Sequence, residues 1–150
     1  MKNLIIFLFL IFFHFQSNSQ QRDEDLVKFI EKWESVPYRF GGKTMKGIDC
    51  SKLTQKLYRE VYKIEIPGVS WEQWNFSDRI PKDSLQTGDL VFFKSRRSPS
   101  GWHVGLYLDN GYFFHAANKN EGVKISSLFE DVYIKEYKGA GRIKKDLIIK

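Results

Sequence analysis

The chain has 150 residues, of which 42% are hydrophobic, and carries a net charge of +6 at neutral pH. This length supplies one hydrophobic core and leaves little room for a second domain. The basic residues are spread along the chain without a dense run, a balance that suits an acidic polymer. We expect no nucleic-acid partner.

An unbroken apolar run, Leu4–Phe13, follows Lys2 near the N-terminus, and Ser17-Asn18-Ser19 then supplies small residues at the positions that a signal peptidase reads. The run is too short for a membrane span, which needs roughly 20 residues. We therefore expect residues 1–19 to be a cleaved secretory signal and residues 20–150 to be a single domain. The mature protein would be exported, periplasmic or extracellular, with no stable membrane anchor.

Amphipathic helices are predicted in the first half of the domain. The first is capped by Asp23, has apolar residues at helical spacing and ends before Pro37. The second follows a glycine-rich loop and runs from Cys50 to about Tyr62. A short helical turn follows, with Ser70 as its N-cap.

From Gly88 onward the hydrophobic pattern changes to a period of two and to short apolar runs typical of strands. The predicted strands are Leu90–Phe93, Val104–Leu108, Tyr112–Phe114, Val123–Ile125, Tyr133–Tyr137 and Gly141–Lys144. Helices come first and strands follow through tight hairpins, without alternation of the two. The sequence therefore predicts an α+β fold with an antiparallel sheet.

Cys50, the only cysteine, stands where the glycine-rich loop gives way to the second helix. A thiol acts as a nucleophile only as thiolate, and the positive end of the helix dipole favours that anion. In an exported protein an unpaired cysteine is a reactive thiol or half of an intermolecular disulfide. A small buried hydrophobe is the third possibility.

His103 and His115 are the only histidines after the signal, and they flank one predicted hairpin. A cysteine nucleophile needs a base, and the base needs a third group to fix its tautomer. A two-residue turn at Asn110-Gly111 would place the histidines on opposite faces of the sheet. A three-residue loop, Asp109–Gly111, with its glycine left-handed would pair Gly105 with His115 and put both imidazoles on one face, roughly 7 to 8 Å apart.

That second register also sorts the hairpin by polarity. It gathers apolar residues on the face opposite the histidines: Val104, Leu106, Leu108, Tyr112, Phe114 and Ala116. The histidine face carries Gly105 and Ala117, which are small enough for the start of the Cys50 helix to approach. The sequence does not choose between the two turns independently.

Six segments, in this order, resemble the NlpC family of secreted cell-wall cysteine peptidases, which have a papain-like fold. They are Pro37-Tyr38-Arg39-Phe40-Gly41-Gly42, Asp49-Cys50-Ser51, Ser70-Trp71-Glu72-Gln73, Gly88-Asp89-Leu90-Val91-Phe92-Phe93, His103-Val104-Gly105-Leu106-Tyr107 and Phe114-His115-Ala116. The resemblance implies that Cys50 is the nucleophile, His103 the base and His115 the orienting residue. It implies hydrolysis of an amide in peptidoglycan stem peptides, typically between γ-D-glutamyl and diaminopimelate, with no metal or organic cofactor.

The resemblance also implies a substrate subsite. Tyr38, Asp49 and Ser51 would line the pocket for the amino end of the stem, although Asp49 is equally well explained as a helix N-cap. Trp71 could stack on the substrate or pack on the core, and we name it as a candidate substrate contact. Lys52 departs from the pattern, which has glycine there, and Gly68-Val69 replaces the usual Arg-Thr. We expect a monomer.

Three alternatives remain open at this point. An amidase of the related CHAP type would use the same cysteine and histidine order but cut between sugar and L-alanine. A noncatalytic wall-binding module would be expected to lack a complete cysteine and histidine set. A structural dimer linked through the lone cysteine is the third.

Overall fold

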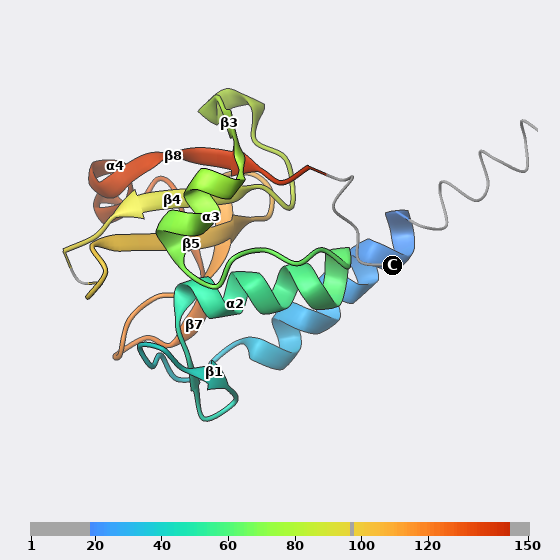
Figure 1. Ribbon diagram of the computed structural model, residues 1–150, viewed down its shortest axis with the longest axis horizontal. Helices are drawn as coiled ribbons and strands as arrows, with labels where there is room; N and C mark the ends of the chain where they lie inside the picture. The colour runs from blue at the N-terminus through green and yellow to red at the C-terminus, as the bar shows by residue number, and fades with distance from the viewer. Residues whose placement is uncertain (1–18, 97, 145–150) are drawn as a thin grey trace, which may run out of the picture.

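A computed structural model describes residues 19–96 and 98–144 (Figure 1). Six strands form one antiparallel sheet in the order β3-β8-β4-β5-β6-β7. Their bounds are β3 Asp78–Ile80, β4 Leu90–Lys94, β5 Trp102–Tyr107, β6 Tyr112–Ala116, β7 Val123–Ser127 and β8 Tyr137–Arg142. The predicted α+β class and antiparallel sheet are confirmed. The signal prediction concerns residues that lie, apart from Ser19, outside the described ones.

The α-helices precede the sheet in the chain, except for the last one. A helix occupies residues 19–33, and it is followed by a small hairpin of β1 (Lys43–Thr44) and β2 (Gly47–Ile48). The other helical segments are α2 Cys50–Leu57, its π-helical continuation Tyr58–Tyr62, α3 Ser70–Phe76, a 3-10 turn Lys82–Ser84 and α4 Asp131–Glu136. None of the described helices is long and apolar enough to cross a membrane.

Asp23 lies inside the first helix, so the prediction that it caps this helix was wrong. Residues 19–22 are already helical, and Gln21 Nε2 donates a hydrogen bond to Asp25 Oδ1 at 3.0 Å, one turn further on. Glutamine and arginine are good helix formers, and nothing in the lead breaks the helix.

Helices cover both faces of the sheet, and each face has its own hydrophobic core. On the first face, the helix over residues 19–33 places Phe29 edge-on against Phe114 of β6, with ring centroids 6.4 Å apart. α2 buries Leu53 and Leu57 completely in the same core, and a leucine side chain contributes about 1.5–3 kcal/mol on burial. On the opposite face, Tyr133 of α4 packs on Phe93 and Phe113.

The segment 133–137 was predicted as a strand, and this was wrong, because residues 131–136 form α4. Its aromatic and β-branched composition suggested a strand. The tertiary packing of Tyr133 overrides that preference. The last strand was predicted over Gly141–Lys144. The observed strand, β8, runs from Tyr137 to Arg142, so it begins four residues earlier and ends two residues earlier than predicted. The short edge strand β3 was not predicted.

The β5–β6 hairpin has the three-residue loop. Leu106 pairs with Phe114 and Tyr107 with Phe113, and the Tyr112 N–H donates to the Asp109 carbonyl at 2.8 Å. Gly111 is left-handed, with φ of 82°. The register predicted for this alternative is therefore confirmed, and His103 and His115 share one face.

Candidate active site

The start of α2 is fixed by Asp49, which is its N-cap. One carboxylate oxygen accepts from the Lys52 N–H at 2.8 Å and from the Ser51 hydroxyl at 2.9 Å, and the other accepts from the Gly41 N–H at 2.9 Å. These bonds tie the glycine-rich loop to the helix and confirm the N-cap role of Asp49. Asp49 and Ser51 are both buried, and their expected contacts with substrate remain predictions.

Cys50 is the first residue of α2, and its thiol is buried, with 5% of the residue exposed. Burial, followed by the charge of Asp49, raises the pKa of Cys50 to about 11. Hydrogen bonding from the Val104 backbone, the Ser70 side chain and the Ser51 backbone acts in the opposite direction. At neutral pH the thiol alone is therefore protonated, and the helix start does not by itself supply a thiolate.

The two histidines form a buried pair. His103 Nε2 lies 2.7 Å from His115 Nδ1, and His115 Nε2 lies 3.0 Å from the Ser126 hydroxyl. The Tyr133 hydroxyl is 3.4 Å from the same His115 nitrogen. His115 is completely buried. Its ring is thus held from both ends, and the ring in turn holds His103.

Ser126 and Tyr133 were missed by the sequence reasoning. Ser126 pairs with Phe113 in the β6–β7 ladder, which makes it a diagonal neighbour of His115 on the same face. A register prediction extended to β7 could have found it. Tyr133 could not be found in this way, because the segment that carries it was assigned to a strand.

The start of α2 meets the β5–β6 hairpin at Val104, the residue next to His103. Cys50 belongs to the core on the face opposite the histidines, together with Val104, Leu106 and Phe114. The histidine face is instead filled by aromatic side chains, among them Phe93 and Phe113. The thiol meets the hairpin at the Val104 backbone, one residue from His103.

A pocket of about 620 Å³ opens beside His103. Its lining residues are Tyr38, Phe40, Ser95, Ser98, Pro99, His103, Ala117, Asn118, Lys119 and Asn120. Burial, followed by the charges of Cys50 and Asp49, raises the pKa of Tyr38 to about 12. Tyr38 is therefore a protonated hydroxyl that lines the pocket and lies close enough to Cys50 to feel its charge.

The two tryptophans of α3 have different surroundings. Trp74 packs edge-on against Phe92, with centroids 5.3 Å apart, whereas Trp71 is 48% exposed. Neither tryptophan is among the described residues that line the pocket beside His103. The prediction that Ser70 is the N-cap of α3 was wrong, because Val69 is the N-cap and Ser70 is the first residue of the helix. The Ser70 side chain hydrogen-bonds Cys50.

We expect Trp71→Ala to raise KM and to leave kcat unchanged, because an exposed aromatic next to Ser70 would contribute only uniform binding to a long substrate. Steady-state kinetics on purified muropeptides measure both constants. Loss of folded protein would show instead that Trp71 is needed for packing.

We expect Gly111→Val to lower activity more than its loss of stability explains. A β-branched residue is strained at this φ, its β-carbon would collide with the Phe129 ring, and a one-residue slip would turn His115 to the other face. The measurements are kcat/KM and the free energy of urea unfolding, each compared between the variant and the native protein. Gly101→Val is the matched control, because Gly101 also has positive φ but has open space around its β-position. Equal losses in both variants would contradict the register argument.

Lys52 and Gly68, two of the departures from the family pattern, lie together. A β-carbon on Gly68 would collide with Lys52 Nζ, so the glycine makes room for the ammonium group. Lys52 also lines a separate basic pocket of about 270 Å³ with Lys43, Gln55, Lys56 and Arg59. Its charge is therefore directed toward the surface of α2 and the turn at Gly68.

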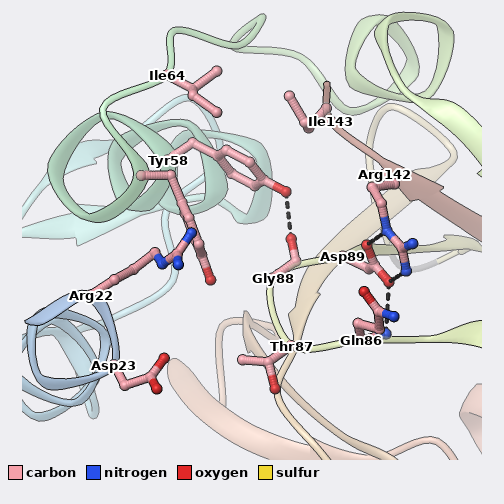
Figure 2. A pocket seen from close by; sticks show the side chains of 11 residues that line it. Arg22, Asp23, Tyr58, Ile64, Gln86, Thr87, Gly88, Asp89, Arg142 and Ile143 are labelled. Carbon is pink, nitrogen blue, oxygen red and sulfur yellow. Dashed lines mark hydrogen bonds and ion pairs between the residues drawn. The ribbon is translucent and has the colours of Figure 1, made fainter. Parts of the chain in front are cut away.

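A second sizeable pocket, of about 360 Å³, lies at the other end of the α2 segment (Figure 2). Tyr58, in the π-helical turn, donates to the Gly88 carbonyl, and Arg142 makes a bidentate ion pair with buried Asp89, both bonds being 2.8 Å. These bonds hold the loop before β4 against the helix. The pocket contains neither the cysteine nor a histidine, so it is separate from the candidate active site.

The helices, the sheet and the position of the cysteine and histidine pair define a papain-like α+β domain. The chain belongs to the NlpC/P60 family, which it matches over residues 35–142. It is 38% identical over 135 residues to the murein DD-endopeptidase MepS/murein LD-carboxypeptidase of Escherichia coli, a match that covers 83% of this chain and 70% of the relative.

Two further relatives extend the comparison. The γ-DL-glutamyl hydrolase of Bacillus subtilis is 33% identical over 121 residues, which cover 80% of this chain and 29% of that protein. A crystal structure of an NlpC/P60 family protein from Bacillus cereus superposes with a TM-score of 0.71 at 32% identity. That alignment covers 79% of this chain but only 39% of the larger structure.

Proposed function

We propose that this protein is a cysteine endopeptidase that hydrolyses amide bonds in the stem peptides of peptidoglycan. Cys50 is the nucleophile, His103 the base and His115 the orienting residue. The observation that carries the proposal is the buried His103–His115 bond of 2.7 Å, one residue from the Val104 backbone that contacts the thiol. The names of the relatives support peptidoglycan as the substrate.

From the hydrogen bonds we infer a role for each ring nitrogen. His103 Nε2 is engaged by His115, so Nδ1 is the nitrogen that takes the thiol proton. Neutral His103 then carries its hydrogen on Nε2 and donates it to His115 Nδ1. His115 in turn carries a hydrogen on Nε2, which it donates to Ser126. When His103 becomes an imidazolium, its bond to His115 gains charge assistance and strengthens.

The reaction follows acyl-transfer chemistry. The thiolate attacks the amide carbonyl, His103 protonates the leaving amine, and water then releases the acyl group from Cys50. The Cys50 N–H, at the start of α2, is one of the donors that a helix leaves unpaired, and it would hold the oxyanion. The Tyr38 hydroxyl is suited to be a second donor, because its pKa of about 12 keeps it protonated.

The bond that we propose first is the one between γ-D-glutamyl and diaminopimelate. The γ-DL-glutamyl hydrolase relative supports a γ-glutamyl substrate. A second candidate is the DD cross-link between stems, which the name of the E. coli relative favours. A CHAP-like amidase activity and a noncatalytic wall-binding module are the remaining alternatives.

Digestion of purified muropeptides, followed by mass spectrometry, tests the proposal. Cleavage after γ-D-glutamyl would shorten the stem, whereas DD cleavage would convert cross-linked dimers to monomers. Release of intact stems from the glycan would indicate an amidase. Binding without any product would leave a wall-binding module and would overturn the enzymatic proposal.

The proposed substrate lies outside the cytoplasmic membrane, so we also propose export and removal of residues 1–19. Edman sequencing of protein recovered from the periplasm or medium should begin at Gln20. An intact Met1 on exported protein would contradict signal cleavage. Gel filtration and non-reducing electrophoresis test the expected monomer against a dimer linked through Cys50.

A further inference from the structure

The pocket beside His103 has one unbalanced charge. Among the described residues that line it, Lys119 is the only lysine, arginine or carboxylate. The other lining groups are aromatic, small or uncharged, apart from His103 itself. A substrate group that enters this pocket therefore meets a positive field.

Lys119 is carried by a closely tied loop between β6 and β7. The Ala117 N–H donates to the Gly122 carbonyl at 2.8 Å, and the Gly122 N–H donates to the Asn118 carbonyl at 2.9 Å. The Asn120 N–H donates to the Asn118 side chain at 2.9 Å. These bonds fix the backbone on both sides of Lys119.

The loop is also tied to the chain that leads to Tyr38. The Val123 N–H donates to the Val36 carbonyl at 2.9 Å, and a β-carbon on Gly122 would lie 2.7 Å from the same oxygen. Val36 is two residues from Tyr38. The position of Lys119 is therefore coupled to the pocket wall that contains Tyr38, and the loop is part of the pocket.

The acid nearest in sequence does not neutralise Lys119. Glu121 forms an ion pair with Lys124 at 2.9 Å and accepts a hydrogen bond from Asn118. Lys119 is exposed and has no ion pair or hydrogen bond with a side chain in the described part of the protein. Its ammonium group can therefore take a ligand without breaking an existing pair.

The proposed substrate supplies a matching anion. A γ-linked glutamyl residue keeps its α-carboxylate, and diaminopimelate within a stem keeps the carboxylate of the centre that lies outside the stem backbone. Amidation of either group removes the charge and leaves the shape nearly unchanged.

We propose that Lys119 is a specificity residue that pairs with a stem-peptide carboxylate, so that the enzyme prefers free-acid stems to amidated ones. This inference rests on the proposed function. It adds a contact on the loop after β6, whereas the family resemblance assigns substrate contacts only to Tyr38, Asp49 and Ser51. Lys119 takes no part in bond cleavage.

The test uses two pairs of synthetic muropeptides, one differing only in acid or amide at the glutamyl α-carboxyl and the other at the diaminopimelate carboxyl. We expect the native enzyme to prefer the acid in at least one pair, and Lys119→Gln to lower kcat/KM for that acid by roughly three- to ten-fold more than for its amide. Lys119→Glu should reverse the preference, and Lys119→Arg should keep it. Lys135→Gln makes the same charge change on α4, away from the pocket, and should leave both substrates unaffected.

The outcomes separate the two proposals. Equal rates on acid and amide in both pairs, or an unchanged preference in Lys119→Gln, would overturn the role of Lys119 while leaving the peptidase proposal in place. A parallel loss on acid and amide would also overturn it, by showing a general structural effect. Absence of cleavage of every muropeptide by the native protein would overturn the proposed function itself.

Discussion

Cys50→Ala and Cys50→Ser should each abolish muropeptide hydrolysis, with kcat reduced by roughly 10⁴-fold or more, as expected when a catalytic nucleophile is removed. The fold should survive, because the side chain is small and the N-cap at Asp49 does not depend on it. The free energy of unfolding, measured by heat or urea, should change by no more than about 1–2 kcal/mol. The paired measurements are muropeptide turnover and unfolding of the same protein preparations.

Two results would contradict this expectation. Retained turnover in either variant would end the cysteine-peptidase proposal. So would a native activity that survives alkylation of the thiol but is lost with a metal chelator. The serine variant is the stricter control, since it keeps a hydroxyl that can hydrogen-bond where the thiol lay.

His103→Ala should be nearly as damaging, and its effect should be visible before any substrate is added. The buried Cys50 thiol has a pKa of about 11, so without a base it would be ionised to only about one part in 10,000 at pH 7. On the proposed mechanism, proton transfer to His103 supplies the thiolate at neutral pH in the native protein. The rate of alkylation by iodoacetamide should therefore be high and nearly level around neutrality in the native protein.

In His103→Ala the alkylation rate should instead be low at pH 7 and rise about tenfold per pH unit toward pH 11, because the raised pKa then governs thiolate formation alone. The same pH profile in both proteins would show that His103 is not the base. His115→Ala should retain some activity, since an orienting group matters less than the base. His115→Asn, which can still hydrogen-bond His103, should retain more.

The parts of the fold that the sequence predicted are those set by local pattern. The period of two on both sides of Asp109–Gly111 and the polarity of the two faces favoured the register that brings His103 to His115, and the structure has it. The helix from Cys50 to Tyr62 was likewise recognisable from its spacing, although its last turn is a π-helix.

The parts that it did not predict depend on contacts between distant segments. Tyr133 becomes helical because its ring packs between Phe93 and Phe113, and no local signal reports that contact. The pKa of Cys50 is set mainly by burial, whereas the sequence shows only the helix start. Ser126 hydrogen-bonds His115, a contact that depends on the order of the strands in the sheet. Ser70 hydrogen-bonds Cys50, a contact that depends on where α3 packs.

The division of the site between the two hydrophobic cores has a mechanical consequence. The thiol is packed with the helices on one side of the sheet, and the histidine pair is packed under α4 on the other. Strand β5 is the element that joins them, through adjacent residues Val104 and His103. Loosening of either core would shift one of the two proposed reacting groups relative to the other, and a displacement of about 1 Å is enough to slow a reaction about 100-fold. The turnover rate should therefore depend on the packing of both cores. On warming, turnover should decline before the secondary structure is lost.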